Sequence, residues 1–196
     1  MNNRTTKLSY LLLILITSLS VTSAFGQNNE FLLQDSQAGI FKVGEEIPFA
    51  EAEKMSYIVQ EKNDVISTPV SDRHEPYYLF YAGKEKLVKI IPEYNYETQS
   101  FNKKVGEVFV FSPKFKTTKG IGVGSTVEEF ASEYADFQLW YTYISDMYGI
   151  DTKGLNAQFL LNGNDYVEKV DFDSDLTILM KSKFKEGSKI HTVRYY

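Results

Sequence analysis

The chain has 196 residues, with 21 Lys and Arg against 26 Asp and Glu, two His and no Cys. This length allows one or two small domains with a hydrophobic core, and a content of 43% hydrophobic and 24% charged residues is typical of a folded globular protein. A sequence without cysteine has no disulfides, no thiolate metal sites, no cysteine nucleophile and no lipid-modified N-terminal cysteine.

The first 26 residues have the pattern of a secretory signal peptide. Arg4 and Lys7 form a positively charged start, an apolar run covers residues 8–16, and small residues stand at positions 24 and 26, where cleavage would be defined. The apolar run is too short to cross a bilayer, which needs about 20 apolar helical residues. We therefore expect an exported protein, periplasmic or extracellular, with no stable membrane anchor after cleavage.

The net charge argues against nucleic acid as a partner. Without Arg4 and Lys7 the chain has 19 Lys and Arg against 26 Asp and Glu, a net charge of −7. Binding to a phosphate backbone needs several cations on one face, but lysines here alternate with acids, as in residues 84–86. An acidic protein also gains nothing from anionic lipid head groups.

Three segments match three later segments in the same order, at an offset of roughly 80 residues. The pairs are 38–44 with 119–124, 80–90 with 159–170, and 105–111 with 190–196. In order, they predict a Gly-rich turn leading into a helix, two strands joined by a Gly turn, and a closing strand rich in β-branched and aromatic residues. The sequence therefore predicts an α+β fold of two tandem repeats, each one helix packed on a small antiparallel sheet. Chance similarity is the alternative.

This interpretation divides the chain into four parts. They are a signal peptide over residues 1–26, a flexible N-terminal segment over 27–37, a first α+β repeat over 38–116 and a second over 117–196. The two predicted sheets could stay separate or fuse into one body.

Two helices have local start signals. Ser125, with Glu128 three residues later, fits a capping box, and the apolar residues 127, 130, 131 and 134 follow at helical spacing. Pro48 is favoured in a first helical turn and precedes Phe49, Ala52 and Met55. We expect both apolar stripes to face the core.

Hairpins are predicted around two glycines. Residues 77–81 and 87–91 flank Gly83, and residues 157–161 and 166–172 flank Gly163. Residues 137–144 alternate like a strand, with a weaker counterpart at 55–66. In the first of these strands Phe137, Leu139, Tyr141 and Tyr143 form the stronger apolar set, so Trp140 is expected on the solvent side.

The run TTKGIGVGST over residues 117–126, followed by a helix and a hairpin, resembles modules of the outer-membrane assembly small lipoprotein family and of the β-lactamase inhibitory protein. It is also similar to many uncharacterised secreted bacterial proteins. The resemblance implies binding and not catalysis, with a sheet face or its loops holding another protein. This chain departs from the pattern because it has no cysteine for a lipid or a disulfide. No partner residue can therefore be carried over.

Other motifs have a chemical and a structural interpretation. Gly120, Gly122 and Gly124 suggest an anion site or a simple turn and helix cap, since Ser125 replaces the last glycine of a dinucleotide fingerprint. Three acids at alternating positions suggest either the start of a calcium loop or a solvated acidic turn, and they are Asp171, Asp173 and Asp175. Neither histidine has metal-ligand spacing, and no cofactor is predicted.

Tyrosine and tryptophan supply contact area at low entropy cost and are common in binding hot spots. The candidate partner-binding residues are Trp140, Tyr141, Tyr143, Tyr148, Tyr94 and Tyr96. Together these patterns predict a non-enzymatic exported binding module, inhibitor-like or an envelope accessory, with a protein partner preferred over a glycan. The alternative is a secreted hydrolase acting on cell-wall or polysaccharide substrate, for which the sequence offers no pair of acids to name.

Overall fold

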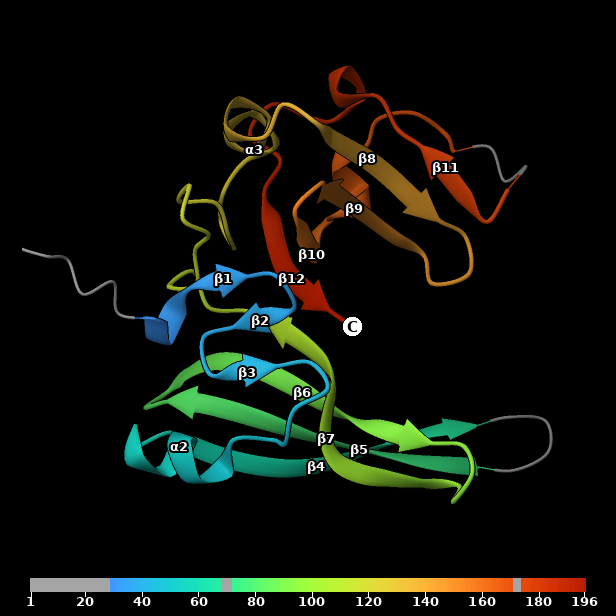
Figure 1. Ribbon diagram of the computed structural model, residues 1–196. Helices are drawn as coiled ribbons and strands as arrows, with labels where there is room; N and C mark the ends of the chain where they lie inside the picture. Colours follow the sequence, from blue (N-terminus) through green and yellow to red (C-terminus); the bar gives the residue numbers. More distant parts are fainter. Residues whose placement is uncertain (1–28, 68–71, 171–173) are drawn as a thin grey trace, which may run out of the picture.

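The computed structural model describes residues 29–67, 72–170 and 174–196 (Figure 1). The predicted signal peptide lies outside these residues. Within them, no helix combines the length and the apolar character that crossing a membrane requires.

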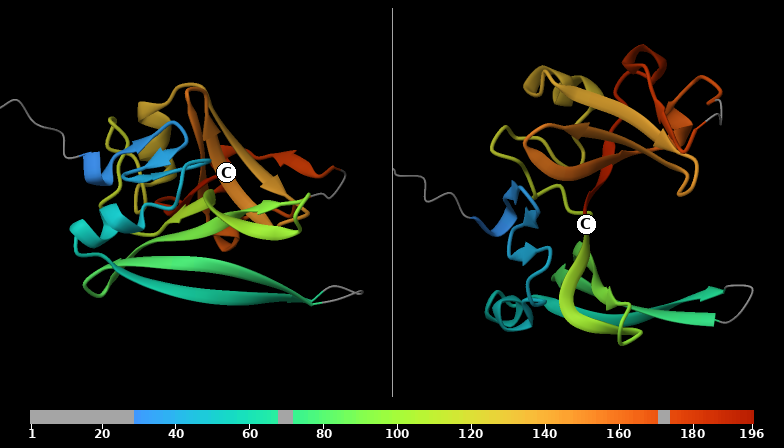
Figure 2. Two further views of the ribbon diagram at one scale, coloured as in Figure 1. Left: turned by 60° about the horizontal axis from the view of Figure 1, so that its bottom comes forward. Right: turned by 45° about the vertical axis from the view of Figure 1, so that its right-hand side comes forward.

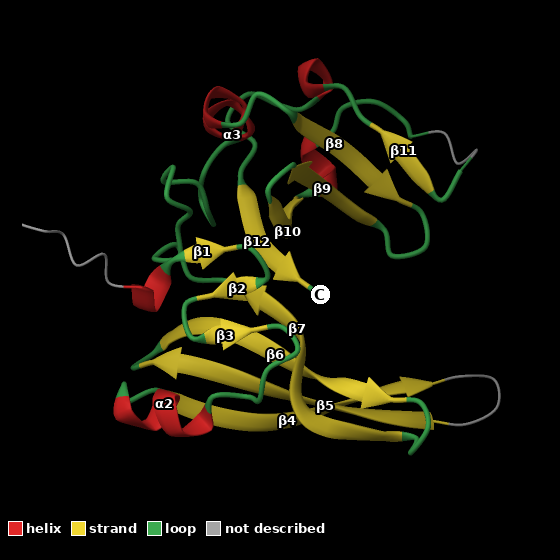
Figure 3. Ribbon diagram, viewed as in Figure 1, coloured by secondary structure: helices red, strands yellow, loops and turns green. Residues whose placement is uncertain are grey.

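Most of the described chain is β-structure, arranged as one large and one small antiparallel sheet (Figure 3). The large sheet has nine strands in the order β11-β8-β9-β10-β12-β7-β6-β5-β4. Its strands are β4 (Ile58–Ser67), β5 (Asp72–Ala82), β6 (Glu85–Asn95), β7 (Ser100–Val110), β8 (Phe137–Thr142), β9 (Met147–Thr152), β10 (Leu155–Leu161), β11 (Leu176–Ile178) and β12 (Ile190–Tyr195). The small sheet contains β1 (Leu33–Gln34), β2 (Gln37–Ala38) and β3 (Phe41–Lys42).

Helical structure in the described residues is short. The α-helices are α2 (Phe49–Lys54) and α3 (Val127–Glu133), and the 3-10 turns are η1 (Asn29–Phe31), η2 (Gly163–Asp165) and η3 (Lys181–Lys183). An α-helix of six or seven residues makes fewer than two turns and covers little of a sheet.

The predicted α+β fold of two tandem helix-plus-sheet repeats is therefore wrong. Of the two arrangements left open for the sheets, the fused one is observed: β4–β7 and β8–β12 form one continuous sheet, because β12 pairs with β7 as well as with β10. Val193 lies opposite Val110, and Tyr195 lies opposite Val108. Most of the layer over the sheet comes from the small sheet and from loops, while the two helices contribute fewer than two turns each.

Several predicted elements are nevertheless present. The hairpin around Gly83 is formed by β5 and β6, and Gly83 has φ +60°, a left-handed conformation that glycine adopts without strain. The strand predicted over residues 137–144 is β8, and the weaker one over 55–66 is β4. Both predicted closing strands, β7 and β12, are also present, and they pair with each other.

The hairpin predicted around Gly163 is wrong. β10 ends at Leu161, and residues Gly163–Asp165 form a 3-10 turn in which the Asn162 side chain accepts a hydrogen bond from the backbone of Asn164. β10 is already flanked by β9 and β12, so neither of its edges is free for a strand that follows directly.

The second helix starts one residue later than predicted. Thr126, and not Ser125, is the N-cap, and it exchanges hydrogen bonds with Glu129 in a capping box. Ser125 instead accepts a hydrogen bond from the backbone of Gly122. Two overlapping Ser/Thr-x-x-Glu patterns therefore compete in the sequence, and the second one caps the helix.

One face of the large sheet packs against the small sheet and both helices, which lie on the same side of β7 and β12 (Figure 2). Phe41 of β3 contacts Phe80 of β5 at a centroid distance of 4.8 Å, and Phe130 of α3 contacts Phe159 of β10 at 4.9 Å. Residues 27–37 were predicted to be a flexible segment. In the part of it that the structure describes, Leu33 is buried and pairs with Ala38.

Candidate binding surface

The opposite face of the large sheet carries partly exposed side chains where β10, β12, β7 and β6 lie side by side. Residues that face each other across paired strands share one side of a sheet. The register accordingly places Gln158, Arg194, Phe109 and Lys89 in one row. We call this surface the open face, and define it as Tyr77, Lys86, Lys89, Glu107, Phe109, Phe111, Gln158, Arg194 and Tyr196.

Arg194 is the centre of the open face. Its Nε and Nη2 donate to Oε2 of Glu107 at 2.9 and 2.8 Å, and its guanidinium lies 5.5 Å from the ring of Phe109 and 5.1 Å from that of Tyr196. Charge-assisted hydrogen bonds and aromatic contacts of this kind hold a long side chain in one position. The side chain at the centre of the open face is therefore held in place by contacts within the protein itself.

Two lysines extend this arrangement. Nζ of Lys89 lies 4.1 Å from the ring centre of Tyr77 and forms an ion pair with Asp64 at 3.2 Å. Nζ of Lys86 lies 3.6 Å from the ring centre of Phe111. The open face thus presents aromatic rings beside cations, and of these residue types the aromatic residues and arginine are enriched in protein interfaces.

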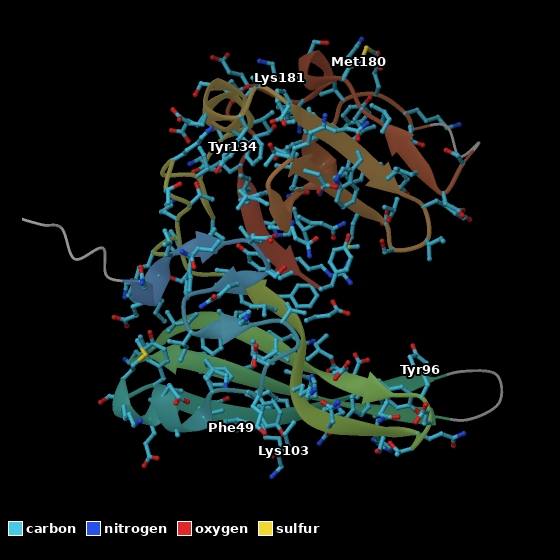
Figure 4. All side chains as sticks on the ribbon, in the orientation of Figure 1. Phe49, Tyr96, Lys103, Tyr134, Met180 and Lys181 are labelled. Carbon is cyan, nitrogen blue, oxygen red and sulfur yellow. The ribbon has the colours of Figure 1, made fainter. Side chains whose placement is uncertain are left out.

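Exposed aromatic and apolar residues occupy two turns that extend to the same side of the molecule, on the right in Figure 1. Tyr96, in the turn between β6 and β7, is 82% exposed (Figure 4). Its ring lies 5.1 Å from that of Tyr94, which also contacts Phe101. In the turn between β8 and β9, Tyr143 is 58% and Ile144 is 79% exposed.

The structure does not place Trp140 at the surface. Register puts it on the side of β8 opposite Leu139 and Tyr141, as predicted, but it is 2% exposed. Its ring lies over Gly149 of β9, where a Cβ atom would come within 2.7 Å of Cη2 of the indole. The expectation that Trp140 is an exposed anchor is therefore wrong, because the missing side chain at Gly149 leaves space that the indole fills.

The remaining candidate tyrosines belong to an aromatic cluster on the covered side of the sheet. The rings of Tyr141 and Tyr148 lie 4.6 Å apart, and Tyr148 also approaches Tyr166. Tyr141 Oη donates to Oδ1 of Asp146 at 3.0 Å. Of the six candidate residues, Tyr96 and Tyr143 are exposed enough to serve as anchors.

Asp151 lies in β9 beside the indole of Trp140. Burial raises the pKa of the Asp151 carboxyl, and the nearby indole N–H opposes part of this increase. Neither Asp151 Oδ1 nor Trp140 Nε1 has a partner within hydrogen-bonding geometry among the described residues. A partly buried carboxyl with a raised pKa makes the folded state less stable once it is charged.

We therefore expect Asp151→Asn to raise the melting temperature at pH 7 but not at pH 3. The raised pKa means that the folded state holds its proton more tightly than the unfolded chain. The free energy of unfolding therefore falls as the pH rises through the ordinary aspartate pKa of about 3.9 and then through the higher value of the folded state. Thermal melts of both proteins at the two pH values test this. An equal gain at both pH values, or a loss at pH 7, would contradict it.

The glycine-rich run acts as a turn in this structure. Gly120 and Gly124 have positive φ angles, and Gly122 lies against the backbone of Phe115. Lys116 crosses the turn and donates from Nζ to the carbonyl oxygen of Val123 at 2.9 Å, while burial lowers the pKa of its ammonium. These contacts fit the structural interpretation of the run.

The predicted acidic turn lies mostly outside the described residues, which include Asp175 but neither Asp171 nor Asp173. Among the described residues, no group of three or more His, Cys, Asp or Glu side chains could hold a metal ion. A hollow of about 450 Å³ lies at the ends of β9 and β10, lined in part by Asp146, Asn162 and His191. Within this lining, Nδ1 of His191 lies 2.9 Å from Oγ1 of its neighbour Thr192.

The central residues of the open face, Arg194 and Phe109, were absent from the sequence prediction. Each lies in a strand that the sequence indicates, and alternation within the strand places each on the side opposite its buried neighbours. Their proximity depends on the pairing of β7 with β12, which are far apart in the chain. No local sequence pattern indicates that β7 pairs with β12.

Comparisons with known proteins bear on the fold. No protein-family model matches the chain, and no curated protein matches it. Among solved structures, the chain is similar to the uncharacterized protein YfeY from Escherichia coli, with a TM-score of 0.51 and 9% identity, over 84% of this chain and 98% of that one. At this identity the likeness concerns the fold alone. It neither supports nor contradicts the resemblance to small lipoproteins and inhibitory proteins.

Proposed function

We propose that this protein is an exported, non-enzymatic binding module that holds a protein partner on the open face. The observation that carries the proposal is the centre of that face, where Arg194 is fixed between Phe109, Tyr196 and Glu107. Side chains already held in place lose little conformational entropy on binding. Arginine and aromatic residues are also the types that most often dominate binding energy.

The two exposed turns complete the proposed surface. Tyr96 and Tyr143 lie in separate halves of the large sheet and extend to the same side. A partner seated on the open face could contact both turns as a rim. This arrangement keeps two of the predicted partner-binding tyrosines and replaces Trp140 with Phe109 as the central aromatic residue.

Replacement of one open-face ring tests the proposal. Immobilised wild-type chain, incubated with exported proteins of the source cell, is expected to retain a partner that Phe109→Ala binds about 30-fold more weakly, which corresponds to the loss of a hot spot. Phe49→Ala is the matched control, because Phe49 is a partly exposed ring of α2 that packs on Tyr78, on the other side of the sheet. Phe49→Ala should retain the partner.

Equal retention by wild type and Phe109→Ala would contradict the proposal. Thermal melts of both variants separate loss of binding from loss of folding. Release of soluble sugars from cell-wall glycan or polysaccharide by the purified wild-type chain would instead support a hydrolase.

A further inference from the structure

The outer edge of β4 is a long and regular strand edge. β4 ends the large sheet, and within the described chain no other strand pairs with its second edge. Its ten residues pair one for one with β5, from Ile58 opposite Tyr81 to Ser67 opposite Asp72, without a bulge. Natural edge strands are usually short, bulged, covered or protected by charged side chains, because unpaired peptide groups attract another strand.

Both ends of this strand carry exposed apolar side chains. Ile58 is 51% and Val59 36% exposed at its start, and Val65 is 55% exposed near its end. β-branched residues of this kind favour strand pairing. Residues 60–64, in the middle of the strand, are all charged or polar. Their charge pattern therefore determines which partner strand β4 can accept.

A second copy of β4 could pair antiparallel with the first about a two-fold axis. In such a pair, opposite residues lie on the same side of the sheet, so the axis passes through one residue that faces itself. An axis at Glu61, Lys62 or Asp64 would place two like charges directly opposite each other, which is destabilising.

An axis at Asn63 gives a complementary arrangement. It places Lys62 of each copy opposite Asp64 of the other, so that two pairs of opposite charges form. Oδ2 of Asp64 already forms an ion pair with Nζ of Lys89 at 3.2 Å, and a carboxylate can accept hydrogen bonds from more than one cation. Of these four central registers, the one at Asn63 is free of like-charge contacts on the axis.

We infer that the protein forms a homodimer in which β4 pairs antiparallel with β4 of a second copy, with Asn63 on the two-fold axis. The axis is perpendicular to the sheet, so the sheet continues from one copy into the next and the two open faces lie on the same side. One pair of ten-residue strands is small compared with a standard interface of about 1,600 Å². We therefore expect dissociation in the micromolar range.

Charge reversal on this strand provides the test. Sedimentation velocity of the wild-type chain from about 1 to 500 μM should show a monomer converting to a dimer. Lys62→Asp places a new carboxylate opposite Asp64 of the other copy, and Asp64→Lys places a new ammonium opposite Lys62, so each variant alone should be monomeric. An equimolar mixture of the two should form a heterodimer, because every opposite pair then has complementary charge.

Lys103→Asp is the matched control, since Lys103 is an exposed strand lysine of β7 (Figure 4). It should dimerise as the wild type does. Far-UV circular dichroism and thermal melts establish that all variants fold. A monomeric wild type throughout the concentration range, dimers of either single variant with wild-type affinity, or a mixture without heterodimers would each overturn the inference.

Discussion

A chain that ends at residue 189 is expected not to fold. Removing β12 takes Val193 and Tyr195 out of the core and leaves one edge of β7 and one edge of β10 without a partner strand. The two halves of the large sheet then lose the strand that joins them. Ile190, Val193 and Tyr195 are buried, and their loss at about 1.5 to 3 kcal/mol each is comparable to the whole stability of a typical domain, about 5 to 15 kcal/mol.

Far-UV circular dichroism, a thermal melt and limited proteolysis measure this effect. The control is a chain lacking only Tyr196, which is 55% exposed and lies beyond β12. That chain should melt within a few degrees of the wild type. A cooperative melt of the chain ending at residue 189 would show that the two halves are stable separately.

Trp140→Ala should lower the free energy of unfolding by about 3 to 5 kcal/mol, the usual cost of truncating a buried large aromatic residue. The indole is 2% exposed and lies over Gly149, so its loss leaves a cavity over that glycine of β9. Urea denaturation of wild type and variant gives the difference. Tyr143→Ala is the control, because this aromatic residue is exposed and close by, and its truncation should cost less than about 0.5 kcal/mol.

A loss below about 1 kcal/mol for Trp140→Ala would mean that the ring is not part of the core. The unfolding slope with urea should stay the same in both proteins, since a change in slope would indicate altered compactness of the unfolded or native state.

Local patterns in the sequence predicted individual elements well where neighbouring residues in the chain determine the structure. A glycine with positive φ made the turn after β5, and alternating apolar residues defined β8 and β7. The start of α3 was misplaced by one residue because Ser125 and Thr126 each precede a glutamate at the right spacing. The preceding turn decides between them: its Gly122 N–H donates to the Ser125 hydroxyl, which leaves Thr126 to cap the helix.

Long-range pairing was the main feature that the sequence did not reveal. The order of strands depends on β12 lying between β10 and β7, and no property of residues 190–195 specifies either neighbour. The fold class was wrong because the two predicted helices have only six and seven residues, so the chain is mostly β-structure and not a pair of helix-plus-sheet repeats. The pairing of β12 with β7 creates the open face, so its central residues could not be predicted either.

Burial of Trp140 shows a different limit. Alternation correctly placed it opposite Leu139 and Tyr141 in β8. Its exposure was then decided by Gly149 on the neighbouring strand, which offers no side chain to hold the ring away from the backbone. A surface inferred from one strand is therefore incomplete until the strand beside it is known.

The position of β12 also sets the order in which the protein can assemble. The strand nearest the C-terminus is an interior strand of the large sheet, so a chain emerging from its N-terminus has β4–β7 and β8–β10 before it has the strand that joins them. Until then β7 and β10 each have an unpaired edge, lined by apolar residues such as Val110 and Phe159. Contacts between distant segments form slowly, and uncovered edges invite pairing with other chains. This protein is therefore most vulnerable to aggregation in the interval before β12 docks between β10 and β7.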